Sequence, residues 1–141
     1  MSSPQTSANG YTRVELADLP TLGGLGDAAW APVRHALNIG AFGVNAFTAA
    51  HSGGVVIEEH DEANSGHEEL YVVLGGHAEF TLDGDKVDAP AGTLVLVRDP
   101  AINREARACQ PGTTILAVGG TPGQAFEPQE WERRRTAALD A

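Results

Sequence analysis

The 141-residue sequence contains a single cysteine, Cys109, which therefore has no partner for a disulfide within the chain. It also has no apolar run that approaches the roughly 20 residues needed to span a bilayer. The opening residues lack the basic and apolar regions of a secretory signal. These absences predict a protein of the reducing cytoplasm that does not enter the membrane.

Basic residues are scarce as well. Nine Lys and Arg residues stand against 19 Asp and Glu residues, and the formal charge is −10. A surface of this charge repels the phosphates of nucleic acids and the anionic headgroups of lipids. We therefore expect neither nucleic acid nor membrane as a partner, and expect a small-molecule ligand or substrate instead.

Glycine and proline are plentiful, with 17 and 8 residues, and they divide the chain into short segments. From Leu37 onward, brief apolar or alternating runs each end at Gly, Pro, Asp or Asn, which is typical of strands joined by tight turns. Asp83-Gly84 lies between two such runs and predicts a hairpin turn. The pattern favours a single all-β domain, built as a sandwich or a barrel.

The two ends of the sequence differ from this middle part. Residues 1–10 are small and polar, which predicts a flexible tail, and residues 11–125 are expected to form the barrel. Within it, residues 19–32 hold too many glycines and prolines for a regular element, so we expect a loop attached to the body by Trp30. Residues 126–141 are rich in helix formers and predict a terminal helix.

One polar cluster, "HDEANSGHEEL", precedes a hydrophobic run and contains the candidate chemistry. In a strand, side chains two residues apart share a face, so His60 lies with Glu62, and His67 lies with Glu69 and Tyr71. If the two strands are neighbours, two imidazoles and two carboxylates converge. Such a set of nitrogen and oxygen ligands suits Zn²⁺, Fe²⁺, Mn²⁺ or Ni²⁺.

Two other interpretations of the cluster remain open. Enclosed in an apolar barrel without metal, Glu69 would favour its protonated form, and it would then act with His60 as a general acid or base. Alternatively, the acidic loop between His60 and His67 is an ordinary solvated turn ahead of a strand.

The spacing of the cluster resembles the first motif of the cupin family. Here Gly54 is followed after five residues by His60, after one by Glu62, after six by Glu69 and after six by Gly76. The family motif has Gly, five residues, His, one, His, three or four, Glu, six, Gly. The loop that contains His67 is therefore longer than in the family.

A second stretch, "APAGTLVLVRDPAINR", resembles the second cupin motif. Counted from Gly92, the position of the family's last histidine is held by Asn103, and either Asn103 or Arg104 can face the cavity. The resemblance covers about residues 40–118. It implies a double-stranded β-helix, or jelly roll, with a ligand cavity inside the barrel and a short C-terminal helix after it.

Cupins commonly hold a divalent metal with three histidines and one glutamate. In this sequence His60 and Glu69 match that set, whereas Glu62 and Asn103 occupy positions of histidines. The resemblance, with His67 added from the longer loop, implies a metal site at His60, Glu62, His67 and Glu69, with Glu69 and His60 as catalytic residues. The expected cofactor is Fe, Mn, Ni or Zn.

Two hypotheses of function follow from the resemblance. The first is a metal-dependent enzyme of small-molecule metabolism, since reactions across the family include isomerisation, cyclisation, decarboxylation, lyase chemistry and dioxygenation. The second is a metal-free module that binds or senses a small molecule, which the loss of family histidines favours. The candidate substrate contacts are Tyr71, Phe80, Arg98 and Asn103. Because open jelly rolls have sheet edges to cover, a homodimer is expected in either case.

Overall fold

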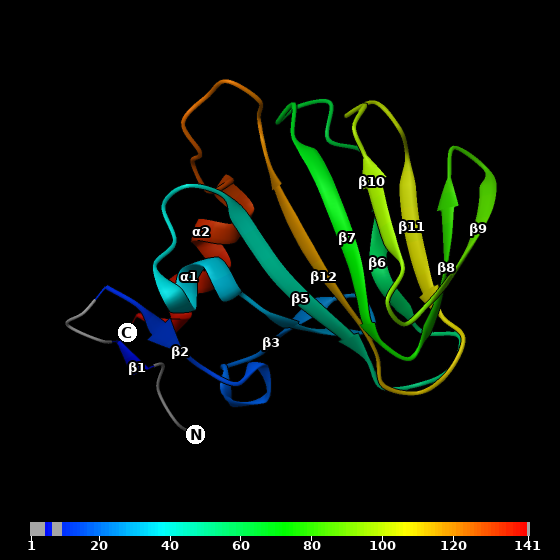
Figure 1. The fold of residues 1–141 in the computed structure, drawn as a ribbon, viewed down its shortest axis with the longest axis horizontal. Helices are drawn as coiled ribbons and strands as arrows, with labels where there is room; N and C mark the ends of the chain where they lie inside the picture. The colour runs from blue at the N-terminus through cyan, green and yellow to red at the C-terminus, as the bar shows by residue number, and fades with distance from the viewer. Residues whose placement is uncertain (1–4, 7–9, 141) are drawn as a thin grey trace.

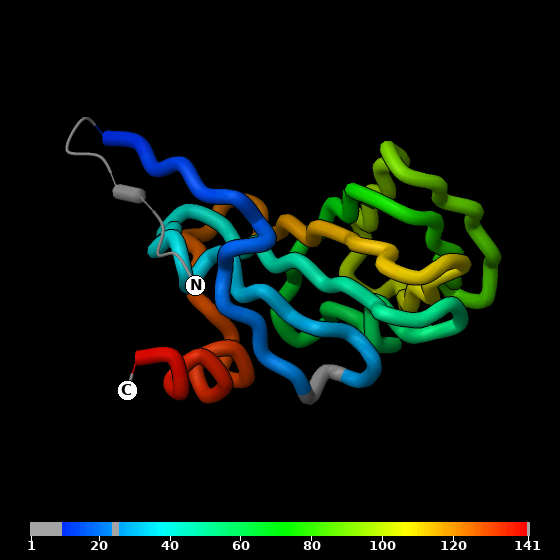
Figure 2. The backbone as a smooth tube through the Cα atoms, turned by 90° about the horizontal axis from the view of Figure 1, so that it is seen from below, coloured from blue at the N-terminus to red at the C-terminus, as the bar shows by residue number. Residues whose placement is uncertain are grey.

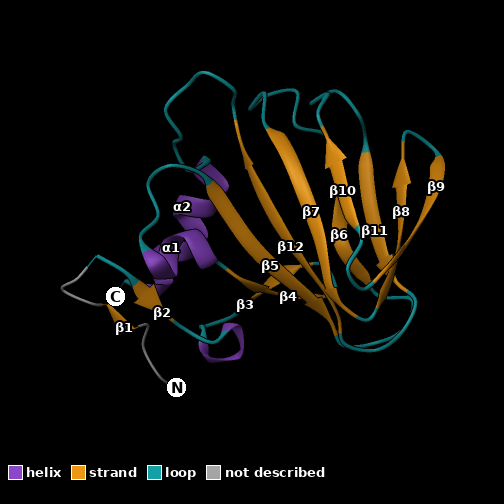
Figure 3. Cartoon of the chain, viewed as in Figure 1, coloured by secondary structure: helices purple, strands orange, loops and turns teal. Residues whose placement is uncertain are grey.

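The computed structural model describes residues 5–6 and 10–140 of the chain (Figure 1). Strands dominate this part of the molecule. The helices gather at the end opposite the hairpin of β8 (His77–Leu82) and β9 (Asp85–Pro90), as Figure 3 shows. The all-β jelly roll with a short C-terminal helix, predicted from the sequence, is confirmed.

Two antiparallel sheets form the body of the molecule, and their strands pair in an order that differs from the chain order. The six-stranded sheet runs, from edge to edge, β10 (Leu94–Val97), β7 (Glu68–Gly75), β12 (Thr113–Gly120), β5 (Gly43–Ala49), β4 (Ala28–Ala31) and β3 (Leu22–Leu25). The four-stranded sheet runs β6 (Val55–His60), β11 (Arg104–Ala108), β8 and β9. Consecutive strands β6 and β7 thus belong to different sheets, and the polar cluster connects them.

The main core lies between the two sheets. Alternate residues of each strand point into it, and Val73 of β7, Ile115 of β12 and Phe80 of β8 are fully buried there. Burial of an aliphatic or aromatic side chain of this size contributes about 2 kcal/mol to folding. A second cluster, which includes Val33 and Val44, lies on the other face of the six-stranded sheet.

Two turns, one of them predicted, have the backbone that their residues require. Asp83 and Gly84 both have positive φ, 48° and 89°, and they join β8 to β9 with Leu82 paired to Asp85, which confirms the two-residue hairpin. Gly76 of the cluster motif has φ 76°, and a Cβ atom there would lie 2.5 Å from the hydroxyl oxygen of Thr113. Only glycine fits this position between β7 and β8.

The region before β5 differs from the expectation of a loop. Strands β3 and β4 form a hairpin there, and β4 pairs with β5 so that Trp30 lies opposite Phe47. Trp30 is completely buried, and its indole N–H donates to Asn45 at 2.8 Å. The loop prediction was wrong because this burial and pairing outweigh the local content of glycine and proline. A short helix, α1 (Val33–Leu37), follows and was not predicted.

The two ends of the chain meet the barrel differently. Within the predicted tail, β1 (Gln5–Thr6) pairs with β2 (Thr12–Arg13), while residues 1–4 and 7–9 lie outside the described residues. The described residues also include two short 3-10 helices, η1 (Leu16–Asp18) and η2 (Ala137–Leu139).

The terminal helix is shorter than the predicted range 126–141. It comprises α2 (Glu130–Thr136), and the residues before it run without regular structure across the end of the barrel. Figure 2 shows α2 at the end of the molecule opposite the β8–β9 hairpin. The ring of Trp131 packs against Trp30 with 5.2 Å between centroids, so α2 attaches to β4. Within the described ranges, no helix is long and apolar enough to cross a bilayer.

Candidate functional site

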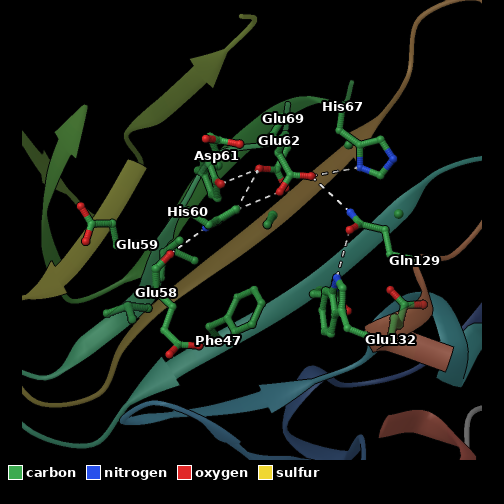
Figure 4. A pocket seen from close by; sticks show the side chains of 18 of the residues that line it. Phe47, Glu58, Glu59, His60, Asp61, Glu62, His67, Glu69, Gln129 and Glu132 are labelled. Atoms are coloured by element: carbon green, nitrogen blue, oxygen red, sulfur yellow. Dashed lines mark hydrogen bonds and ion pairs between the residues drawn. The ribbon is translucent and has the colours of Figure 1, made fainter. Parts of the chain in front are cut away.

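A pocket of about 430 Å³ opens at the end of the barrel that α2 approaches (Figure 4). Its walls come from β5, β6, β7 and β12, and one side is closed by Phe126 and Gln129 from the segment ahead of α2 and by Trp131 of α2 itself. This volume is in the range that proteins use for small ligands. The polar cluster of the sequence lies in the wall of this pocket.

His60, Glu62 and Glu69 converge on one point. His60 ends β6, Glu62 begins the loop after it, and Glu69 is the second residue of β7, so the two sheets bring them together. One ligand atom from each lies within 4.8 Å of the others. The Nε2 atom of His60 is 3.0 Å from Glu62 Oε2 and 3.8 Å from Glu69 Oε1.

His60 is held in one orientation by its own strand. Its Nδ1 atom lies 2.7 Å from the backbone carbonyl oxygen of Glu58. Because a carbonyl oxygen only accepts, Nδ1 carries a proton, and Nε2 faces the two carboxylates. Burial alone would lower the pKa of His60, but hydrogen bonds to Glu62, Glu69 and the Glu58 carbonyl outweigh it and raise the pKa from 6.5 to about 10. Without a metal, His60 is an imidazolium at neutral pH.

Glu62 is the most enclosed carboxylate of the cluster, with 8% of the residue exposed. Its Oε1 atom accepts hydrogen bonds from the hydroxyl of Ser65 at 2.8 Å and from the amide of Gln129 at 3.2 Å. Burial tends to raise the pKa of Glu62, but the hydrogen bonds from His60 and Ser65 and the charges of His60 and His67 lower it below its usual value. Glu62 is therefore ionised.

Glu69 lies against a buried guanidinium and not against an apolar wall. Arg104 is fully buried, and its Nη1 donates to Glu69 Oε1 at 2.9 Å. The hydroxyl of Tyr71 donates to the same oxygen at 2.6 Å. Burial and the charge of Glu69 raise the pKa of Tyr71 well above its usual value, so this proton stays on the phenol. The expected apolar enclosure of Glu69 is not found, because Arg104 and Tyr71 both donate hydrogen bonds to it.

His67 lies beside this cluster without joining it. Its Nδ1 atom is 3.5 Å from Glu62 Oε1, and its ring packs against Phe126 with 5.8 Å between centroids. Of the four residues expected to hold a metal, the structure thus brings His60, Glu62 and Glu69 to one point and places His67 behind Glu62. Figure 4 shows this arrangement, with Gln129 between His67 and α2.

Three of the four expected substrate contacts lie away from the pocket, and only Tyr71 lines it. Phe80 is buried in the core, where its ring packs against that of Tyr71 with 5.5 Å between centroids. Arg98 continues the outward face of β10, is exposed, and pairs with Glu68 at 3.4 Å. The amide of Asn103 donates to Glu59 at 2.7 Å and does not line the pocket.

Arg104, and not Asn103, points into the barrel because of strand alternation. In β11 the residues Arg104, Ala106 and Ala108 are buried, and the residues between them face outward. Asn103 lies one residue before the strand, so it has the outward orientation. The position of a residue counted from the distant Gly92 is uncertain by one residue. A shift of one residue moves a side chain to the other face of the sheet.

Several pocket residues could not have been found from the sequence motif. Phe126, Gln129 and Trp131 reach the pocket only because the segment ahead of α2 crosses the barrel end, and Phe47 lies on a strand outside the motif. Their positions depend on contacts between residues far apart in the sequence, such as Trp30 with Trp131. No local sequence pattern predicts such contacts.

The atoms of the cluster are of the kinds that hold a divalent metal. They offer one imidazole nitrogen and two carboxylates, and the Glu58 carbonyl orients the imidazole as outer partners of metal ligands do. The buried Arg104 contributes a fixed positive charge behind Glu69, which leaves Glu62 as the carboxylate without an arginine partner. The residues therefore fit a metal held from the pocket side.

Solved structures with similar folds are cupins. A cupin protein from Bacteroides fragilis aligns with a TM-score of 0.58 and 18% identity, over 84% of this chain and 91% of that one. A predicted oxalate decarboxylase from Thermotoga maritima aligns with a TM-score of 0.62 and 20% identity, over 77% and 98%. A sugar phosphate isomerase of the cupin superfamily from Silicibacter pomeroyi aligns with a TM-score of 0.60 and 15% identity, over 77% and 74%.

At these low identities, the structural superpositions establish a shared fold alone. No protein-family model matches the sequence, and no curated protein matches it either. The chain thus has the barrel that the spacing of its first motif predicts, and what happens inside the pocket has to be argued from its own residues.

Proposed function

We propose that this chain, a protein of the cupin fold, is an enzyme that converts a small organic molecule in the barrel pocket with the help of a divalent metal. The observation that carries the proposal is the convergence of His60, Glu62 and Glu69 within 4.8 Å in the wall of a pocket of about 430 Å³. The structural neighbours described as an isomerase and a decarboxylase support enzymatic use of such a barrel.

The metal would be held by His60 Nε2 and by one carboxylate oxygen each of Glu62 and Glu69. Fe²⁺, Mn²⁺, Ni²⁺ and Zn²⁺ all accept such a set of ligands, whereas metals that prefer thiolates would find none here. When bound, the metal supplies a Lewis acid that polarises a substrate oxygen.

The protein's own residues prepare the pocket for this chemistry. Arg104 and Tyr71 both donate to Oε1 of Glu69, which fixes the position of that carboxyl group. His67 lines the pocket next to Glu62 and is the group placed to take a proton from the substrate or return it. The aromatic side chains around the pocket, among them Phe126 and Trp131, exclude water from the reacting atoms.

Metal analysis of the purified protein tests the proposal. After exposure to Fe²⁺, Mn²⁺, Ni²⁺ and Zn²⁺ followed by desalting, we expect one metal ion per chain, and we expect His60→Ala and Glu62→Gln to lose it. His51→Ala is the matched control, because His51 is an exposed histidine that does not line the pocket. A protein that retains no metal, or a His60→Ala variant that binds metal as the natural protein does, would contradict the proposal.

One observation favours a second candidate function, a metal-free binding module. In the absence of metal the two carboxylates already have cationic partners, since His60 is protonated beside Glu62 and Arg104 pairs with Glu69. The same metal analysis separates the two functions. A stable, folded protein without metal under all four conditions would favour the binding module.

A further inference from the structure

The charges around the pocket are one-sided. Six carboxylates line it, and among the described residues no lysine or arginine does. Glu62 and Glu69 have cationic partners, and Glu132 pairs with Arg34. The remaining three, Glu58, Glu59 and Asp61, form no ion pair with any described residue.

The two arginines next to the pocket do not line it, and both already pair with carboxylates. The Nε, Nη1 and Nη2 atoms of Arg104 donate to Glu69 and to backbone carbonyls, chiefly that of Ile102 at 3.1 and 3.0 Å. Arg34 donates to Glu132 and to the carbonyl of Ile39. A carboxylate or phosphate on a ligand would therefore enter the pocket without the guanidinium or ammonium partner that such groups usually find in proteins.

The rest of the lining suits the opposite charge. Four aromatic residues line the pocket, from three different parts of the chain: Phe47, Tyr71, Phe126 and Trp131. The faces of aromatic rings attract cations, and the exposed carboxylates beside them add a negative potential that favours the same charge. Aromatic rings next to unpaired carboxylates are the usual surroundings of an ammonium group.

Glu58 and Phe47 mark one end of the pocket. Figure 4 shows both at its lower end, while Glu62 and His67 lie near the top. The Glu58 carboxylate accepts no hydrogen bond from a described residue, although the Glu58 backbone carbonyl is bonded to His60. A molecule with an ammonium group at the Glu58 end would thus present its other end to the cluster of His60, Glu62 and Glu69.

We infer that the pocket binds a small organic cation, an ammonium group on an apolar body, with the ammonium between the Glu58 carboxylate and the Phe47 ring. The inference names the substrate class of the site and in that sense rests on the proposed function. It distinguishes this chain from proteins that bind anions such as sugar phosphates. It also states which end of the substrate reacts.

Three ligands of equal size and different charge provide the test: benzylamine, benzyl alcohol and benzoate, each titrated into the natural protein and followed by calorimetry and amide NMR. We expect benzylamine to bind at least about fivefold more tightly than benzyl alcohol, and benzoate to bind more weakly than either. Added salt should weaken benzylamine binding selectively.

Glu58→Gln should reduce the preference for benzylamine over benzyl alcohol to less than about twofold. Glu59→Gln is the matched control, since it removes the same charge from the next residue, whose carboxylate binds Asn103. Failure of all three ligands to bind, benzoate binding as tightly as benzylamine, or Glu58→Gln with an unchanged preference would overturn the inference.

The same titrations in the metal-free protein and in His60→Ala separate this inference from the proposed function. If no metal binds but benzylamine is still preferred through Glu58, the metal-dependent reaction is wrong and the ligand class stands. If metal binds through His60 and benzoate is preferred, the ligand class is wrong and the metal site stands.

Discussion

Arg104 places a permanent positive charge inside the barrel, completely shielded from solvent. It is tolerated because the carboxylate of Glu69 and several backbone carbonyls surround it and satisfy its donors. Glu69 depends on this arrangement equally, since without Arg104 it would be a carboxylate facing the core. The pair therefore joins β11 of one sheet to β7 of the other.

Replacement of Arg104 by methionine should lower the free energy of unfolding by about 4 kcal/mol, because it leaves Glu69 and the carbonyls without their donors. Urea denaturation of the metal-free protein measures this. Arg107→Met is the matched control, because Arg107 lies on the same strand but is exposed, and its contacts are an ion pair with Glu105 and a long hydrogen bond to the carbonyl of Gly53. We expect a loss below about 1 kcal/mol. A similar loss of stability in both variants would show that the buried Arg104 stabilises the protein no more than an exposed arginine does.

His60 should make the stability of the metal-free protein depend on pH. Its pKa is raised from 6.5 to about 10 on folding, so the folded chain binds this proton more strongly than the unfolded chain. The resulting stabilisation is complete below pH 6.5 and is lost as the pH rises to about 10. Unfolding free energies measured across this range should fall less steeply in His60→Gln than in the natural protein.

His51→Gln, an exposed histidine outside the pocket, serves as the control and should keep the natural slope. Parallel curves for the natural protein and His60→Gln would mean that the proton on His60 has no part in stability. The measurement uses a chelator throughout, so that metal binding does not contribute.

For single residues, the sequence predicted the site correctly where the spacing within one segment decides which side chains come together. His60, Glu62 and Glu69 follow from a local motif, and the structure brings them together. The sequence could not decide whether Asn103 or Arg104 points into the barrel. The count from Gly92 crosses a turn of variable length, and an error of one residue exchanges the two faces of a strand.

Among the elements, α2 and the segment ahead of it decide whether the pocket is enclosed. Glu132 of α2 pairs with Arg34 of α1, and both side chains are nearly buried, at 5% and 11% exposed. Trp131 adds its contact with Trp30, and its N–H donates to Gln129, which in turn donates to Glu62. A chain of contacts thus runs from the first helix to the cluster of His60, Glu62 and Glu69.

Replacement of Glu132 by alanine should therefore lower the free energy of unfolding by about 3 kcal/mol, since Arg34 would stay nearly buried without its partner. Glu130→Ala offers the matched control on the same helix, because Glu130 is exposed and its pair with Arg134 is weak at 4.0 Å. Hydrogen exchange in α2 should accelerate in the first variant only. Unchanged exchange there would show that the pair does not hold α2 in place.

Strands were predictable from alternation and from turn residues in the middle of the chain, and the hairpin at Asp83-Gly84 is confirmed. The hairpin of β3 and β4 was missed because its glycines are poor strand formers and prolines lie on both sides of it. Pairing with β5 and the burial of Trp30 stabilise it. The length of α2 was also not predictable, because it depends on the contacts of Trp131 with Trp30 and of Glu132 with Arg34.

For the whole molecule, the homodimer stays a prediction, and the structure offers a surface for it. Strand β10 forms one edge of the six-stranded sheet and exposes Leu94 and Leu96, and Leu74 of the neighbouring β7 is exposed too. Exposed leucines on an unpaired edge favour contact with a second copy.

Light scattering at micromolar concentration should show a dimer for the natural protein and a monomer for the double variant Leu94→Lys, Leu96→Lys. Gln110→Lys, on an exposed turn away from β10, adds charge elsewhere and should leave the dimer intact. A natural protein that is monomeric throughout the concentration range would refute the prediction.

The part of the chain that completes the pocket leaves the ribosome after every strand of the two sheets that the structure describes. Both sheets can pair before residues 126–132 emerge, because no described strand of either sheet follows Gly120. During translation the barrel would therefore present an open, acidic cavity until Phe126, Gln129 and Trp131 arrive. Ligand capture would then begin only after Trp131 has emerged and packed against Trp30.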